Sequence, residues 1–255
     1  MSPLVEFSSD RCKIAEIIGT WDNAIESLEK LITAKRKLKL KQGLMQQLLT
    51  GKKRFKEFES SEWINYKLSE IATVTMGTSP KSEAYNSEGQ GLPLLQGNAD
   101  IKNRYSSPII WTSDVTKECY PDDILMSVRA PVGTISLSLH HACIGRGIAS
   151  VRFKEDKTNQ SYLHQLLLFF ETCWTKISQG STFDSVNSND IKNCIFKLSS
   201  LIDEQRKIAS ILSKVDMEIS TLETKLTAYK LQKRGLMQQL LTGKKRVKIP
   251  VETTT

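Results

Sequence analysis

The sequence predicts an α+β protein in which one globular domain is flanked by two long α-helices. The first observation is a repeat: residues 43–54 and residues 235–246 share the sequence Gly-Leu-Met-Gln-Gln-Leu-Leu-Thr-Gly-Lys-Lys-Arg. The second is a unique middle segment, where five of the seven prolines fall between residues 80 and 131. We therefore expect a helical segment over residues 1–56, a globular domain over residues 57–200 and a second helical segment over residues 201–255.

Apolar residues in each flanking segment recur at alternating steps of four and three positions. This spacing is typical of a coiled-coil seam, because it averages about 3.5 residues and keeps one stripe facing a partner helix. Gly51 and Gly243 each follow Leu-Leu-Thr, where a left-handed helix cap favours glycine. The predicted seam residues are Ile14, Ile18, Trp21, Ile25 and Leu28 in the first segment, and Ile208, Leu212, Val215, Ile219, Leu222 and Leu226 in the second.

A simpler interpretation is that both segments are ordinary amphipathic helices of one helical protein. The repeat also preserves polar residues, however, since Gln46-Gln47 and Lys52-Lys53-Arg54 recur in the second copy. Core packing alone does not require this identity, whereas a shared external partner or two-fold pseudo-symmetry does.

The composition argues against several classes of protein. The chain has no apolar run of about 18 residues, so no membrane span is expected. Its first residues lack the basic start and apolar core of a secretion signal. The five cysteines are scattered without a Cys-x-x-Cys pair, so neither a zinc site nor a disulfide framework is expected. Reduced thiols are typical of a cytoplasmic protein.

The net charge of +8 is concentrated in two stretches of the chain. Residues 30–56 carry ten Lys and Arg and no acid, residues 224–248 carry eight and no acid, and the remainder is therefore net negative. Basic segments of this kind favour contact with phosphates or with an acidic protein surface. Solvated helix faces and a flexible basic tail are the alternative.

In the middle segment, short runs of β-forming residues are separated by Gly, Pro, Asn and Asp, which indicates strands joined by loops. An apolar run over Tyr162–Ile177 predicts a helix, a turn-rich loop follows at Gln179–Phe183, and Ile191–Leu198 predicts a final strand. The other expected strands are Leu92–Gln96, Pro108–Trp111, Ile124–Val128, Thr134–Leu139 and Ala149–Phe153.

The sequence contains no recognisable catalytic constellation. No Ser or Cys lies in a nucleophile elbow, and no glycine-rich phosphate loop is present. His140 and His141 lie near Cys143, but adjacent residues on a strand point to opposite faces and do not readily share one site. We therefore expect a chain that is not an enzyme, without a catalytic residue, metal or cofactor of its own.

Several segments resemble a known family in their order and spacing. The domain opens with Trp63–Ala72, continues with Gly77-Thr78-Ser79-Pro80 and Pro121–Gly133, and contains Gly180-Ser181-Thr182-Phe183 near its end. The segment Glu204–Ala209 then starts the second helical segment with Glu-Gln-Arg-Lys-Ile-Ala. Together with the repeated helices, these segments resemble the specificity subunit of type I restriction–modification enzymes over nearly the whole chain.

The resemblance implies a target recognition domain at residues 57–200, between spacer helices that lie antiparallel as a coiled coil. In that family the usual order is domain, helix, domain, helix, and each domain reads half of an interrupted DNA sequence. Methyltransferase subunits that carry S-adenosylmethionine bind along the helices and domains, and a restriction subunit carries the ATP-driven motor. This chain has a single domain and resembles the C-terminal half of such a subunit.

The partners implied by the resemblance are double-stranded DNA, methyltransferase subunits and a restriction subunit. A second recognition domain would come from a homodimer or from another half-subunit, and the frequency of closed two-fold assembly favours the homodimer.

Four loops combine polar side chains with glycines and aromatic residues, namely residues 75–85, 96–105, 128–133 and 179–189. Such side chains can bond base edges and phosphates. The candidates for base reading are Lys81, Gln96, Asn98, Lys102, Arg104, Arg129 and Asn187. Tyr105 is a candidate for stacking or for packing on the DNA backbone, and Thr78, Ser181 and Thr182 are better suited to phosphates.

Three other interpretations stay open from the sequence alone. The chain could be a helical assembly scaffold that does not bind DNA, a DNA-modifying enzyme that acts alone, or a silent recombination cassette.

Overall fold

In the computed structural model, residues 3–40, 43–178 and 185–247 are described. The chain divides into two compact units, a helical unit of Met1–Lys39 with Lys214–Thr255 and a globular unit of Leu40–Ser213. The helical unit contains α1 (Pro3–Leu40) and the part of α7 (Ile202–Leu241) that begins at Lys214. The globular unit mixes strands with short helices, so the predicted α+β class with two long flanking helices is confirmed.

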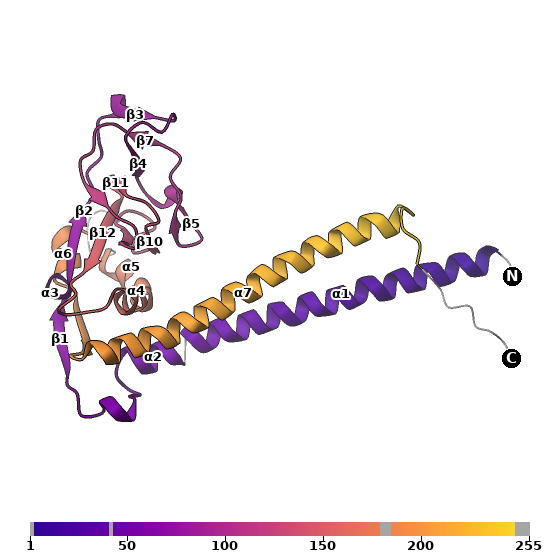
Figure 1. Cartoon of the computed structure of the whole chain (residues 1–255), viewed down its shortest axis with the longest axis horizontal. Helices are drawn as coiled ribbons and strands as arrows, with labels where there is room; N and C mark the ends of the chain where they lie inside the picture. Colours follow the sequence, from indigo (N-terminus) through magenta and orange to yellow (C-terminus); the bar gives the residue numbers. More distant parts are fainter. Residues whose placement is uncertain (1–2, 41–42, 179–184, 248–255) are drawn as a thin grey trace. The chain divides into compact units, whose positions relative to one another are not determined.

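The long helices α1 and α7 run side by side in opposite directions (Figure 1). The ring of Trp21 packs edge-on against Tyr229 at 5.4 Å between centroids, and Lys35 pairs with Glu218 at 2.6 Å. The residue numbers therefore rise along one helix in the direction in which they fall along the other. The predicted antiparallel pairing is therefore confirmed. The predicted seam residues that lie half-buried or buried in this unit are Ile14, Ile18, Trp21, Ile25, Leu28, Val215, Ile219, Leu222 and Leu226.

The first turns of α7 belong to the globular unit. Ile208 and Leu212, which the heptad pattern assigns to the helix seam, are almost fully buried in the main hydrophobic core of this unit. The apolar stripe of α7 therefore packs into the domain core over the first turns of the helix. From Lys214 onward it packs against the partner helix.

The globular unit is built on two sheets and a separate strand pair. In the first sheet the strand order is β2 (Ala72–Met76), β12 (Ile148–Phe153), β9 (Ile124–Ser127), β10 (Ile135–Leu137), β6 (Tyr105–Ser106) and β5 (Ile101–Lys102). In the second it is β3 (Tyr85–Asn86), β7 (Trp111–Thr112), β4 (Leu92–Leu95), β11 (Ala142–Ile144) and β8 (Glu118–Cys119). Strand β1 (Trp63–Lys67) pairs antiparallel with β13 (Ile195–Ser199).

Short helices accompany these strands in the described part of the globular unit. They are α2 (Leu44–Leu49), α3 (Leu68–Ile71), α4 (Gln160–Phe169), α5 (Glu171–Ser178) and α6 (Ser188–Lys192), with single 3₁₀ turns at Lys56–Phe58, Ser82–Ala84 and Asn98–Asp100.

Strand β9 lies between two hydrophobic cores. Alternate residues of a strand point to opposite faces. Ile124 and Met126 accordingly join the main core, whereas Leu125 joins a smaller core with Leu95 and Ile144. All four residues of β9 are buried, which explains why its sequence is a continuous apolar run rather than an alternating one.

Four of the five predicted strand runs other than Ile191–Leu198 contain a strand. In the fifth, Pro108–Trp111, only Trp111 is in a strand, β7. Pro108 has no N–H to donate to a β-ladder, which disfavours strand structure at the start of that run.

The apolar run Tyr162–Ile177 forms two helices, α4 and α5, rather than the one that was predicted. They meet at Phe170, whose ring packs edge-on against Phe196 at 5.0 Å between centroids. Aromatic pairs of this kind contribute about 0.5–1.5 kcal/mol beyond their burial. The sequence run alone does not reveal this distant partner.

The predicted strand Ile191–Leu198 begins instead in helix α6, and strand β13 starts only at Ile195. Asn187 caps α6, since its Oδ1 accepts bonds from the N–H groups of Asn189 at 2.8 Å and Asp190 at 3.0 Å. The Asp190 carboxylate accepts from the N–H of Asn187 at 3.1 Å. This capping box stabilises a helical turn within a segment whose composition favours a strand.

The two copies of the twelve-residue repeat end in the same backbone cap. Gly51 and Gly243 both have φ +70°, and their N–H groups donate to Leu48 and Leu240 at 3.4 and 3.2 Å. The predicted left-handed caps are therefore confirmed.

The surroundings of the two copies differ. The first copy forms α2, a helix separate from α1, with Leu49 only 1% exposed in the main core. The second copy is the end of α7, and its Leu241 is 64% exposed. A Cβ on Gly51 would lie 3.0 Å from the Trp63 ring, whereas one on Gly243 would have no neighbour within 4 Å.

Candidate nucleic-acid interface

Three loops of the globular unit meet at backbone contact distance around Gly77, Gln96 and the turn Gly145–Gly147, which we call the glycine junction. A Cβ on Gly77 would lie 2.1 Å from the carbonyl oxygen of Gly145, and a Cβ on Gly147 would lie 2.1 Å from that of Gln96. No side chain fits at either position, so glycine is what allows the three loops to approach.

Backbone hydrogen bonds hold the junction together and attach a fourth loop. The N–H of Thr78 donates to the carbonyl of Ile144 at 2.9 Å. The N–H of Val128 donates to the carbonyl of Gly147 at 3.0 Å. The residue after Val128 is Arg129, so this second bond places a predicted base-reading residue beside the junction.

Four predicted residues are brought together in this region. Thr78, Gln96 and Arg129 are exposed, and Asn98 is half-buried. The Asn98 Nδ2 donates to the carbonyl of Pro131 at 3.2 Å, which ties the loop after β4 to the loop after β9. The result is a cluster of hydroxyl, amide and guanidinium groups on loops that are fixed by a rigid sheet scaffold.

A second group of predicted residues lies on the β5–β6 hairpin. Its two-residue turn has left-handed backbone at Asn103 (φ +50°) and Arg104 (φ +69°), as a type I′ turn requires. The Arg104 guanidinium forms an ion pair with both carboxylate oxygens of Glu171, with Nη2 to Oε2 at 2.9 Å. Its donors are thus largely committed within the protein, while Lys102 and Tyr105 are exposed.

The remaining predicted residues differ in exposure and in the hydrogen bonds that they form. Lys81 is exposed, and its N–H donates to Asp114 Oδ2 at 3.2 Å. Asn187 is exposed but uses its side-chain oxygen as the cap of α6. Ser181 and Thr182 lie outside the described residues.

Arg146 is a polar residue of the junction that the sequence analysis missed. It is exposed between the buried Gly145 and Gly147. Its backbone N–H and its Nε both donate to Ser79 Oγ, at 3.3 and 3.2 Å. The tripeptide Gly-Arg-Gly was the available signal, but its importance depends on the contact with Ser79, which lies far away in the sequence.

The arginines of the globular unit fall into two classes. Four of the six are ion-paired with a carboxylate: Arg54 with Glu204, Arg104 with Glu171, Arg152 with Asp123 and Arg206 with Asp203. For Arg129 and Arg146, no carboxylate partner is recorded among the described residues. Both lie at the glycine junction, so positive charge without an internal counter-charge gathers there.

The adjacent histidines take part in separate structural contacts. His140 Nδ1 lies 2.7 Å from Ser106 Oγ. His141 Nε2 lies 2.6 Å from Glu118 Oε2 and its ring stacks on Tyr120 at 4.5 Å. Hydrogen bonds from His141 and then Tyr120 hold the pKa of Glu118 below its ordinary value. Across residues 3–40, 43–178 and 185–247, no three His, Cys, Asp or Glu side chains gather as a metal site would need.

None of the helices within these ranges combines the length and the apolar character that crossing a membrane requires.

Comparison with known proteins decides the family. Residues 60–229 match the family model described as the type I restriction modification DNA specificity domain. The chain belongs to this family. The resemblance found in its motifs is therefore confirmed.

Relatives in the specificity family are longer than this chain. It is 33% identical over 246 residues to the putative type I restriction enzyme MjaX specificity subunit of Methanocaldococcus jannaschii, covering 92% of this chain and 57% of that protein. It is 25% identical over 259 residues to the MjaVIII specificity subunit of the same organism, covering 92% and 60%. The chain thus spans somewhat more than half the length of these relatives.

Solved structures agree with this assignment. A chain from a structure of complex assembly and conformational transition in the type I R-M system superimposes with a TM-score of 0.69 at 26% identity, covering 94% of this chain and 60% of that one. The HsdS subunit of Thermoanaerobacter tengcongensis gives a TM-score of 0.65 at 26% identity, covering 94% and 59%. The fold of this chain thus corresponds to about 60% of the length of each of these chains.

Proposed function

We propose that this chain supplies DNA sequence specificity to a type I restriction–modification complex, with its one domain reading half of an interrupted site. The observation that carries the proposal is the glycine junction. It gathers exposed polar side chains from four loops, with two arginines for which no acidic partner is recorded, in a chain of the specificity family. Donors held on rigid loops are suited to base edges in the major groove.

In this proposal residues 57–200 are the target recognition domain, and residues 1–56 and 201–255 are the spacer segments. Gln96, Asn98 and Arg129 reach base edges and Thr78 bonds a phosphate. Each base-reading contact is worth about 1–3 kcal/mol of discrimination. Lys81 and Lys102 are further candidates for base reading, and Tyr105 is a candidate for stacking or for packing on the DNA backbone. The proposal also retains Arg104, Ser181, Thr182 and Asn187 as candidates.

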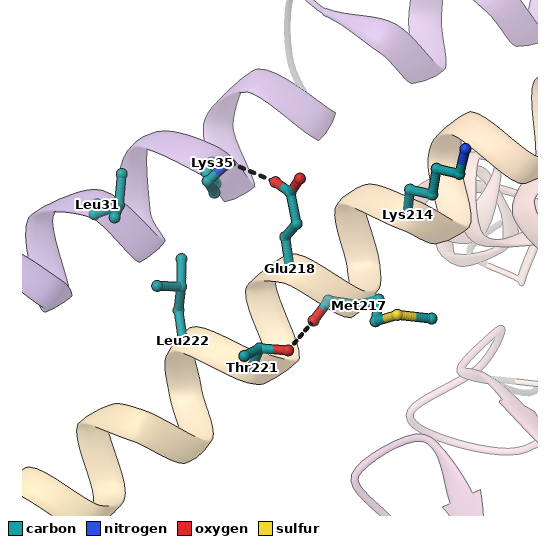
Figure 2. Close-up of a pocket in the computed structure, with 7 residues that line it drawn as sticks. All are labelled: Leu31, Lys35, Lys214, Met217, Glu218, Thr221 and Leu222. Atoms are coloured by element: carbon teal, nitrogen blue, oxygen red, sulfur yellow. Dashed lines mark hydrogen bonds and ion pairs between the residues drawn. The ribbon is translucent and has the colours of Figure 1, made fainter.

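We further propose that the helical unit sets the distance between two recognition domains and provides a docking face for methyltransferase subunits. This unit has a groove of about 540 Å³. Figure 2 shows the residues that line it. Two apolar residues at the groove are well exposed, Leu31 by 44% and Met217 by 70%. The groove residues are Leu31 and Lys35 of α1 and Lys214, Met217, Glu218, Thr221 and Leu222 of α7.

One recognition domain specifies only half a bipartite site, so a second is needed. We propose that a second copy of this chain supplies it, because closed two-fold pairing is the commonest assembly of a single chain. Another half-subunit is the alternative, and a restriction subunit can join either complex. The described cysteines are all free thiols, which supports a cytoplasmic complex.

The proposed chain is not itself catalytic. The methyl donor, S-adenosylmethionine, would be bound by the partner methyltransferase subunit, and methylation would require the target base to be flipped into that subunit's pocket. The role of this chain is to hold the complex at one sequence and in one register, which is what phosphate and base contacts do.

The test is to express the chain with its methyltransferase subunit in a host without DNA methylation and to sequence the modified bases. A two-part motif with a fixed gap is the expected result, and a symmetric motif would support the homodimer. The matched variant Arg129→Ala should relax one position of the motif. Soluble complexes that methylate no motif would overturn the proposal in favour of an assembly scaffold.

A further inference from the structure

Arg146 lies on a tightly packed turn of the globular unit. Gly145 and Gly147 pack against the backbone of Gln96, and the N–H of Gly145 donates to the carbonyl of Leu95 at 2.8 Å. The Arg146 backbone is therefore held by close contacts on both sides. An exposed cationic side chain on such a turn loses little backbone entropy when it binds a ligand.

The guanidinium of Arg146 is also oriented before any ligand binds. Its Nε donates to Ser79 Oγ at 3.2 Å, and the same hydroxyl oxygen accepts from the Arg146 N–H at 3.3 Å. No partner is recorded among the described residues for its two terminal nitrogens. The guanidinium therefore keeps two parallel N–H donors, one on each terminal nitrogen, for a pair of acceptors on a ligand.

This geometry favours a particular kind of acceptor. A phosphate can be neutralised by a flexible cation, so it does not require a braced side chain. Two parallel donors at fixed spacing match the O6 and N7 acceptors on the major-groove edge of guanine, the commonest specific contact of arginine with DNA. A bound protein carboxylate would also match, but its charge would oppose the DNA backbone next to which the junction is proposed to lie.

We propose that Arg146 reads a guanine of the target site and that Ser79 is the positioning residue that orients its guanidinium. This inference rests on the proposed function, because it names one specificity contact of the same DNA-reading surface. Arg146 is linked to Arg129 through the hydrogen bond between Gly147 and Val128, so the two arginines address neighbouring parts of the site.

The experiment uses the complex of the full chain with its methyltransferase subunit and duplexes that carry the motif found by sequencing of modified bases. Arg146→Ala should weaken binding to the motif roughly 5- to 150-fold and leave binding to an unrelated duplex nearly unchanged. Arg146→Lys keeps the charge but loses the fork, so it should also lose discrimination at that position. Ser79→Ala should give a smaller loss in the same direction.

A guanine analogue makes the test specific. Replacing each guanine of the motif in turn by 7-deazaguanine removes the N7 acceptor. At one position the wild-type complex should lose affinity while Arg146→Ala loses nothing more. Arg206→Ala is the matched control, because it removes an exposed charge from the start of α7, which is not one of the candidate loops. Thermal unfolding should be unchanged for Arg146→Ala and Arg206→Ala.

The possible failures are distinguishable. If Arg146→Ala weakens motif and unrelated duplexes equally, Arg146 is a phosphate contact and the inference is wrong. If it changes neither, Arg146 does not contact DNA. In both cases a wild-type complex that still selects its motif leaves the proposed function standing. A wild-type complex without sequence preference would overturn the proposed function and this inference with it.

Discussion

The repeat offers a matched pair of substitutions, Arg54→Ala and Arg246→Ala, in the same twelve-residue sequence. Arg54 binds Glu204 through two hydrogen bonds, Nε to Oε1 at 2.9 Å and Nη2 to Oε2 at 2.7 Å. The Glu204 side chain is only 1% exposed. Arg246 is exposed, and no ion pair is recorded for it among the described residues. The two changes are chemically identical and differ only in their surroundings.

The expected loss of stability follows from the group that is left behind. Arg54→Ala strands a buried carboxylate, and removing one partner of a buried pair costs about 3–5 kcal/mol. Ser61 Oγ still donates to Glu204 Oε2 at 3.1 Å, which places the expected loss near the lower limit, about 3 kcal/mol. Arg246→Ala should change the free energy of unfolding by less than about 0.5 kcal/mol.

Urea unfolding followed by tryptophan fluorescence and circular dichroism measures both values. The double variant Arg54→Ala with Glu204→Gln should recover part of the loss, because no charge is then left buried without a partner. Equal, small effects of the two single substitutions would refute the reasoning. A large effect of Arg246→Ala would show that the second copy also lies in a buried site, such as one formed with another chain.

The pH dependence of the same pair has a definite sign. Burial raises the pKa of Glu204, but hydrogen bonds from Arg54, Ser199 and Ser61 and the charge of Arg54 outweigh burial, so the pKa is below its ordinary value of 4.5. A carboxyl whose folded pKa is lowered contributes stability that is complete above its unfolded pKa and is lost as the pH falls through its folded pKa. The wild type should therefore lose this stability as the pH falls below about 4.5, and its advantage over Arg54→Ala should disappear once Glu204 is protonated in both proteins.

Three further predictions concern packing, thiol reactivity and helix propensity. Gly147→Ala should destabilise the chain by about 1–3 kcal/mol and weaken motif binding, because the new Cβ would meet a carbonyl oxygen at 2.1 Å. Gly97→Ala should do neither, because a Cβ there would have no neighbour within 4 Å. Urea unfolding and duplex binding measure the two effects. Burial raises the pKa of the Cys119 thiol to about 11, so at pH 8 iodoacetamide should modify the exposed Cys12 and leave Cys119 unmodified, as measured by mass spectrometry. Gly235→Ala should raise the stability of α7 by up to about 1 kcal/mol, since this glycine is inside the helix with open space around it; thermal unfolding by circular dichroism would contradict this if it showed a lower Tm.

Features that depend on short sequence distances were predictable. The seam of the long helices follows from alternating steps of four and three, and the caps at Gly51 and Gly243 follow from glycine after Leu-Leu-Thr. Two of the loops that form the glycine junction, those of Gly77 and Gln96, were also found, because Gly, Pro and Asn mark turns through their own backbone preferences, whereas the turn Gly145–Gly147 was not.

Features that depend on distant partners were not predictable. The role of Arg104 changes with its ion pair to Glu171, and that of Arg146 with its contact to Ser79, each 67 positions away. The sequence supplied a list of polar loop residues but no means of separating side chains used inside the protein from those left for a ligand. Only the folded arrangement distinguishes Arg129 and Arg146 from the other arginines of the unit.

The repeat shows the same distinction within one molecule. Twelve identical residues give the same left-handed cap in both copies, so local sequence is sufficient for the backbone there. Burial is not determined locally, since Leu49 is buried whereas the equivalent Leu241 is exposed. The difference in free energy between Arg54→Ala and Arg246→Ala therefore measures the contacts of Arg54 outside the repeat, with Glu204 and with the following residues 58–61, because the intrinsic propensity of the twelve shared residues cancels.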